Sequence, residues 1–63
     1  MAEVKQDGNK WWVSINSYWV TVLTSWGQTD WVRQAKQRQT KAEAERLCQE
    51  INDYLKEREV RVY

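Results

Sequence analysis

Five tryptophans lie between Trp11 and Trp31 of a 63-residue chain that contains no phenylalanine and no proline. A chain of this length forms one domain and buries only about 60% of the surface that its unfolded form exposes. Each Trp or Tyr side chain can bury roughly 150 to 250 Å², which supplies core area that aliphatic residues alone would not. The tryptophan-rich stretch therefore predicts a small core built from indole rings, and the aromatic residues left outside it are candidates for binding.

The charge and the cysteine content exclude several classes of protein. Ten Lys and Arg against nine Asp and Glu give a net charge of +1, well short of the basic balance of many small nucleic-acid-binding proteins. A single cysteine, Cys48, and the absence of histidine argue against a disulfide or a zinc site. With no signal peptide or membrane-spanning run, the protein is expected to be cytoplasmic.

The first part of the chain predicts an arm followed by a strand. Residues 1–9 are polar and end in turn-forming residues, so they are expected to form a flexible N-terminal arm before a single domain of residues 10–63. From Lys10 onward the apolar residues alternate with a period of two, which is typical of a strand.

Two further strands are expected after this one. A two-residue turn at Asn16 and Ser17 would pair the first strand with a second strand over residues 18–26. A polar loop containing Gly27 would then lead into a third strand over residues 31–38. These segments predict a three-stranded antiparallel meander.

A helix and a fourth strand complete the predicted fold. Thr40 and Glu43 form a capping box, which indicates that a helix begins there. After Arg58 the period returns to two, which predicts a short C-terminal strand and an α+β fold of the order βββαβ. Apolar residues recur at three- and four-residue spacing along the helix and should pack on the sheet: Ala44, Leu47, Cys48, Ile51, Tyr54 and Leu55.

No catalytic constellation is found in the sequence. Without histidine, and with Cys48 in the buried helix stripe, a nucleophile has no base to activate it. The carboxylates lie on the exposed helix surface, where neighbouring Lys and Arg keep them ionised. The two glycines are isolated, so no loop is built to hold phosphates. We therefore expect a binding protein without a cofactor or bound metal, rather than an enzyme.

One helix would leave the other face of the predicted sheet uncovered. In the expected register Trp11, Trp26 and Trp31 lie under the helix, whereas Trp12 and Trp19 point outward beside the cations of the third strand. An exposed aromatic patch costs solubility unless a partner uses it. The candidate binding residues are Trp12, Trp19, Thr21, Leu23, Gln34, Lys36, Arg38 and Lys41. A loop one residue longer or shorter would swap the faces of the third strand.

Three kinds of partner are compatible with this patch. In a DNA complex Lys36, Arg38 and Lys41 would meet phosphates, while Gln34 and Thr21 reach base edges and the indoles stack. In a complex with a host protein, as an inhibitor or adaptor, Trp and Arg are the commonest energetic anchors. Alternatively, the face pairs with itself in a homodimer or is covered by the N-terminal arm.

Two segments resemble a known family of DNA-binding domains. The runs KWWVSI and QRQTKAEAERL, within residues 8–55, resemble the arm-type domain at the N-terminus of phage and transposon tyrosine-recombinase integrases. This resemblance implies three antiparallel strands that lie in the major groove of DNA and are backed by a helix. The present chain is less basic than that family, and EVRVY follows the helix. The predicted layout is also similar to small phage inhibitors of host enzymes, such as the RNA polymerase inhibitor of a coliphage. Both resemblances imply a phage or mobile element acting in a bacterial host cell.

Overall fold

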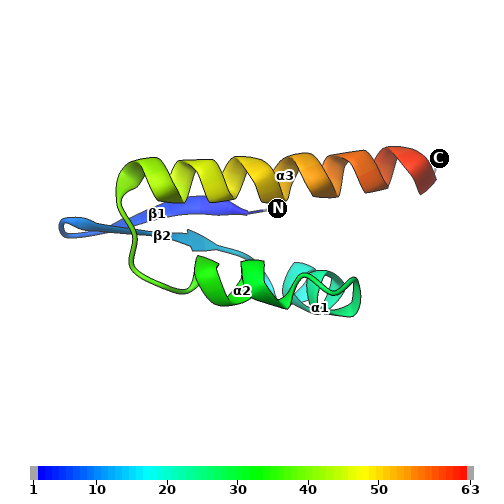
Figure 1. The fold of residues 1–63 in the computed structure, drawn as a ribbon, viewed down its shortest axis with the longest axis horizontal. Coiled ribbons are helices and arrows are strands. Elements are labelled where there is room, and N and C mark those ends of the chain that lie inside the picture. Colours follow the sequence, from blue (N-terminus) through cyan, green and yellow to red (C-terminus); the bar gives the residue numbers. More distant parts are fainter. Residues whose placement is uncertain (1, 63) are drawn as a thin grey trace.

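The fold consists of one long helix with a β-hairpin and a short helix packed against it, and a second short helix that packs against the other short one (Figure 1). The computed structural model describes residues 2–62, with side chains described as far as Arg58. The elements are β1 (Glu3–Asp7), β2 (Lys10–Ser14), α1 (Ser17–Ser25), α2 (Thr29–Ala35) and α3 (Lys41–Val62). The prediction of an α+β protein is correct only at that level. The described residues form a two-stranded antiparallel sheet and three helices, so the predicted βββαβ order is wrong.

The hairpin uses residues that were expected to form a loose arm. β1 pairs with β2 in a register that sets Val4 opposite Val13 and Lys5 opposite Trp12. Gly8 has a φ of +63°, whereas its loop partner Asn9 keeps a negative φ. This is the pattern of a type II′ turn, whose twist matches that of the flanking strands. The expected first strand is therefore present as β2, but its partner precedes it in the sequence.

The predicted second strand is instead helix α1, because both residues assigned to hairpin loops act as helix caps. The Asn16 Oδ1 accepts a hydrogen bond from the Trp19 backbone N–H at 2.9 Å, as an N-cap does. At the other end Gly27 adopts a φ of +83°. The N–H groups of Gly27 and Gln28 donate to the carbonyls of Thr24 and Leu23, which is a Schellman motif.

The predicted third strand is also wrong, since residues 29–35 form helix α2. An ion pair between Arg33 and Asp30 at 2.9 Å supports one turn of this helix. The backbone of Gln39 alone pairs with the free edge of β2, exchanging hydrogen bonds of 3.0 and 2.7 Å with Trp11. The free edge of β2 thus pairs with a single residue and not with a further strand.

Helix α3 begins where the capping box predicts. The N–H of Glu43 donates to Thr40 Oγ1 at 3.3 Å, and the N–H of Thr40 donates back to the Glu43 carboxylate at 3.2 Å. The predicted fourth strand is wrong because the helix continues to Val62. Strong helix formers precede the two alternating valines, and a lone strand gains nothing without a sheet edge to join. Tyr63 lies outside the described residues.

The core lies between α3 and the other elements. The predicted apolar stripe of α3 is buried at Ala44, Leu47, Ile51 and Leu55, while Cys48 and Tyr54 are partly buried against it. Opposite the stripe lie five further buried residues from the N-terminus, β2, α1 and α2: Ala2, Val13, Leu23, Val32 and Ala35. No helix in the described part of the chain is long and apolar enough to cross a membrane.

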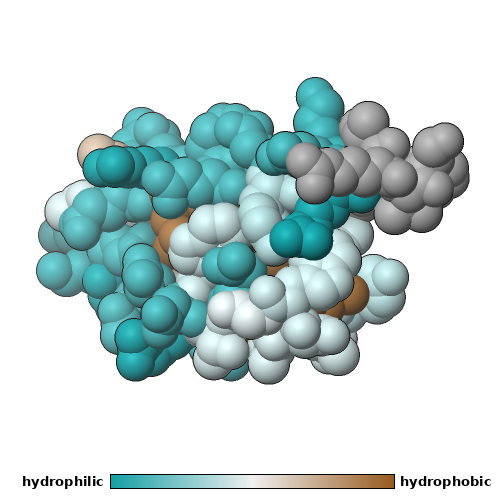
Figure 2. Space-filling view, turned by 45° about the vertical axis from the view of Figure 1, so that its right-hand side comes forward, coloured by the Kyte–Doolittle hydropathy of each residue, from teal (hydrophilic) through white to brown (hydrophobic). Residues whose placement is uncertain are grey.

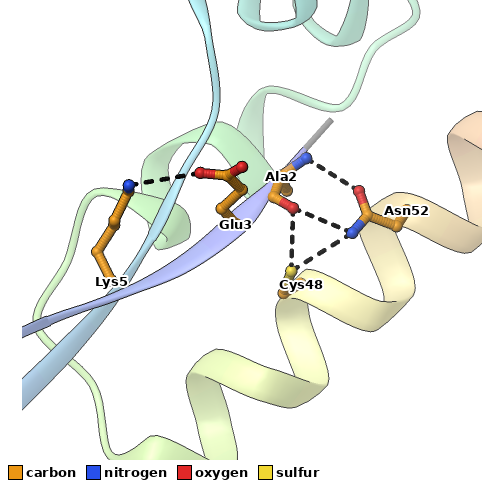
Figure 3. A network of polar contacts seen from close by, with 5 residues as sticks. All are labelled: Ala2, Glu3, Lys5, Cys48 and Asn52. Atoms are coloured by element: carbon orange, nitrogen blue, oxygen red, sulfur yellow. Dashed lines mark hydrogen bonds and ion pairs between the residues drawn. The ribbon is translucent and has the colours of Figure 1, made fainter.

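The start of β1 is fastened to α3 by side chains of the helix (Figure 3). Asn52 accepts from the Ala2 N–H at 2.9 Å and donates to the Ala2 carbonyl at 3.1 Å. The Cys48 thiol donates to the same carbonyl at 3.3 Å. Because Ala2 is only 5% exposed, these bonds replace water that its backbone groups have lost. They hold the hairpin in place on α3.

Candidate binding surface of the hairpin

One face of the hairpin points away from α3. Side chains alternate along a strand, so Val4, Trp11 and Val13, which pack on the core, leave the opposite face to the residues between them. We call this the hairpin face, formed by Glu3, Lys5, Asp7, Lys10, Trp12 and Ser14. Trp12 lies at its centre, directly opposite Lys5 on the neighbouring strand.

A small groove runs between the hairpin face and α2, with a volume of about 90 Å³. It brings together two of the predicted binding residues, Trp12 from β2 and Lys36 from the end of α2. Trp12 is half-buried there, whereas Lys36 is exposed. The groove is smaller than the roughly 300 to 1,000 Å³ of sites for drug-sized ligands. Its other lining residues are Val13, Ser14, Ile15, Val20, Val32 and Ala35.

Cations outnumber carboxylates around this face. Lys5 pairs with Glu3 at 3.4 Å, and Arg38 pairs with Asp7 at 2.6 Å. Within residues 2–58, Lys10 and Lys36 have no carboxylate within 4.0 Å. The segments 3–14 and 36–43 together carry five cations, Lys5, Lys10, Lys36, Arg38 and Lys41, and three carboxylates, Glu3, Asp7 and Glu43. A polyanion would therefore be attracted to this end of the molecule.

Lys41 belongs to the same end but contacts the other face of β2. Its Nζ lies 5.5 Å from the centre of the Trp11 ring, within the range of a cation–π contact. Lys41 is exposed, so its ammonium group is accessible from solvent as well. The contact fixes the first turn of α3 against the edge of the hairpin.

The other predicted binding residues do not share this face. Leu23 is 0% exposed and belongs to the core, where it cannot contact a partner. Trp19 is half-buried in α1, where its ring meets Tyr18 edge-on at 5.0 Å. Thr21 is exposed on α1 and donates to the Ser17 carbonyl. These positions follow from α1 being a helix, which separates residues that a strand would align.

Gln34 lies on the opposite side of α2 from the groove. Its carbonyl accepts from Gln39 Nε2 at 2.8 Å, and both residues line a second, polar depression against α3. Gln39 Oε1 is buried there without a hydrogen-bond partner among the described residues. Arg46 and Glu50 in the same depression pair with each other at 3.6 Å, so their charges largely cancel.

The titratable groups with shifted pKa values lie in structural positions. Burial raises the pKa of the Cys48 thiol, which keeps it protonated as a donor to Ala2. Hydrogen bonds from the hydroxyl and N–H of Thr40 lower the pKa of Glu43. Within residues 2–58, no three His, Cys, Asp or Glu side chains gather as metal ligands would.

A second exposed surface was missed by the sequence analysis. Trp26, expected in the core, is 40% exposed, and Tyr18 is 66% exposed. Trp26 lies beside Tyr54 of α3 with ring centroids 6.0 Å apart. The signal for this helix lay in Asn16 and Gly27, which as caps place Trp26 at an exposed helix end but which suit hairpin turns equally well.

Comparison with protein-family models, curated proteins and solved structures finds no match to this chain. The three-stranded sheet that the resemblance to integrase arm domains implies is absent from residues 2–62, where the sheet has two strands. The resemblance itself stays a prediction from its two motifs.

Proposed function

We propose that this chain is a non-enzymatic binding module that contacts DNA through the hairpin face. The observation that carries the proposal is that Trp12 of the hairpin face shares a groove with Lys36, and that neither Lys10 nor Lys36 has a carboxylate partner among residues 2–58. A two-stranded β-ribbon is one of the elements that the major groove of DNA admits. The two motifs shared with integrase arm domains favour the same ligand and a phage or mobile-element source.

The distribution of charge supports an anionic ligand at the hairpin. Residues 43–57 of α3 carry five carboxylates, Glu43, Glu45, Glu50, Asp53 and Glu57, and two cations, Arg46 and Lys56. At the hairpin end cations outnumber carboxylates instead. A near-zero net charge thus conceals a molecule with a cationic end and an acidic helix surface, and its field would orient DNA toward the hairpin.

The cations on and beside the hairpin face, and Trp12, have separate roles in the proposed complex. Lys10 and Lys36 bind phosphates directly. Lys5 and Arg38 contribute after exchanging their exposed carboxylate partners for phosphate, which costs little because exposed ion pairs contribute only about 0 to 1 kcal/mol. Trp12 is half-buried, so only part of its indole can contact sugars or bases.

The test is the salt dependence of binding to a fluorescein-labelled DNA duplex, followed by fluorescence anisotropy. Each phosphate contact contributes about 0.9 to the slope of log K against log salt concentration. The double variant Lys10→Ala/Lys36→Ala is expected to bind more weakly and to reduce that slope by about 1.8.

The matched control removes the same charge from the acidic surface of α3. Arg46→Ala/Lys56→Ala changes the net charge equally but leaves the hairpin intact, so its slope should equal that of the wild type. The assignment of DNA binding to the hairpin face would be refuted if the wild type did not bind DNA at low salt. It would also be refuted if both double variants lost the same amount of DNA affinity.

A further inference from the structure

Arg58 lies in a corner formed by two aromatic rings. Its Cζ is 5.0 Å from the centre of the Trp26 ring and 4.7 Å from that of Tyr54. The two rings meet at an interplanar angle of 62°, and Trp31 supports Tyr54 from another side with its ring edge-on at 5.1 Å. We call these four residues, Trp26, Trp31, Tyr54 and Arg58, the aromatic surface.

The surroundings of Arg58 are uncharged on the side of α1. Residues 11–29 contain no Asp, Glu, Lys or Arg. Figure 2 shows a broad area of intermediate hydropathy on this side of the molecule, interrupted by a few hydrophilic and hydrophobic groups and bordered by hydrophilic side chains. Arg58 itself is exposed and has no carboxylate within 4.0 Å among residues 2–58. Its guanidinium is therefore held by the rings while its N–H groups remain available.

We propose that the aromatic surface binds an acidic segment of another protein. Arg58 would receive a carboxylate of that segment, and the exposed part of Trp26 would receive the apolar side chain beside it. A guanidinium offers a planar fork of donors that fits a carboxylate with two parallel hydrogen bonds, and stacking on aromatic rings limits its motion in advance. Trp, Tyr and Arg are also the residue types that dominate the binding energy of protein interfaces.

The charge around the aromatic surface favours a short acidic segment over a nucleic acid. α1 has no cation, and Asp53 and Glu57 lie on α3 on either side of Tyr54 in the sequence. A polyanion would gain little attraction here, whereas one carboxylate needs only Arg58. The hairpin turn, at the other end of the long axis (Figure 1), is the more cationic region.

The competing explanation is that Arg58 only holds the Trp26 ring, at the C-terminal end of α1, against α3. An exposed cation–π contact would do so to a modest extent. This role requires a cation but no planar fork, so Lys at position 58 would largely fulfil it. A role in carboxylate binding requires the fork as well, and the two roles therefore differ in the variant Arg58→Lys.

The test is a selection of short random peptides displayed on phage against the wild-type protein, followed by affinity measurements on the selected peptides. We expect the selected peptides to carry Asp or Glu next to an apolar residue. Their affinity should fall about tenfold or more in Arg58→Ala and Arg58→Lys, as expected for loss of hydrogen bonds between charged groups. Replacing the acidic residue of the peptide by its amide should have the same effect.

Arg46→Ala, which removes an exposed arginine from the same helix, is the control and should bind the peptides like the wild type. Circular dichroism establishes that each variant is folded. The proposal is overturned if no peptide is selected, if the selected peptides lack carboxylates, or if Arg58→Lys retains full affinity. It is also overturned if single-stranded DNA displaces the peptides from the wild type and the Arg58→Ala variant no longer binds that DNA.

Discussion

The hairpin face and the aromatic surface present the same residue types in opposite arrangements. On the hairpin face Trp12 is half-buried, and the cations around it reach into solvent or pair with Glu3 and Asp7. On the aromatic surface Trp26 is 40% exposed, and a single cation rests on the rings. On the aromatic surface tryptophan thus supports a cation directly, whereas on the hairpin face the cations around Trp12 interact with solvent and carboxylates.

The difference has a consequence for how each region would attract a partner. Several cations in solvent act over about 8 to 10 Å at ordinary ionic strength and lose their effect as salt is added. One arginine beside the uncharged helix α1 acts only at contact, so it selects among partners without attracting them from a distance. Helix α3 packs against the hairpin and α2 and carries Arg58 itself, so it makes both regions part of one domain.

The largest expected effect comes from the side chain that attaches β1 to α3, because its loss should affect the hairpin face and not the aromatic surface. Asn52→Ala removes the bonds to both backbone groups of Ala2 and should destabilise the fold by roughly 1 to 2 kcal/mol, partly offset by the better helix propensity of Ala. The β1 amides should exchange faster and DNA binding should weaken, while peptide binding at Arg58 is retained. Urea unfolding and hydrogen exchange measure these effects.

Gln49→Ala is the control for this variant. It also removes an amide from α3, but its hydrogen bond is an exposed one to Asp53 at 2.8 Å. Its urea midpoint should stay near that of the wild type. Equal midpoints and equal β1 exchange in the two variants would mean that the Asn52 bonds do not hold the hairpin.

Helix α3 is the part of the fold that the sequence predicts well. Its capping box and its apolar stripe are local patterns, and no other element has to be known to interpret them. The hairpin contained a usable signal in the dipeptide Gly8-Asn9, which is typical of two-residue hairpin loops. The polar sequence of β1 concealed it, because four of its five side chains are exposed.

Residues 16–38 could not be assigned in the same way. Asn16 and Gly27 suit a tight turn and a helix cap equally, and the β-branched residues between them favour a strand. Tertiary packing decided the outcome, because α1 places Trp19, Val20 and Leu23 on one side toward the core. Of the predicted site, Trp12 and Lys36 come together because β2 was assigned correctly and α2 ends beside it. Leu23 and Trp19 were misplaced with the false strand.

The second expected effect uses the two glycines as a matched pair. Both have positive φ, +63° at Gly8 and +83° at Gly27, and a Cβ at either position would meet no atom within 4 Å. Alanine should therefore cost about 1 kcal/mol or more at each through backbone strain alone, and asparagine, which tolerates the left-handed helical region, should cost less at Gly27. Gly8→Ala should weaken DNA binding, and Gly27→Ala should weaken peptide binding beside Trp26. If each variant reduced both activities equally, the two surfaces would not be independent.

The smallest expected effect is a pH dependence that concerns the hairpin end. Hydrogen bonds from Thr40 hold the pKa of Glu43 below its ordinary value of 4.5. A carboxylate with a lowered folded pKa stabilises the fold above its unfolded pKa, and this contribution is lost as the pH falls through the folded value. Because Thr40 follows the residue that pairs with Trp11, the first loosening should occur where α3 meets β2. Glu43→Gln keeps a capping side chain without the charge, so its urea midpoint should fall less than that of the wild type between pH 7 and pH 3. Parallel decreases in the two proteins would assign the acid sensitivity to other carboxylates.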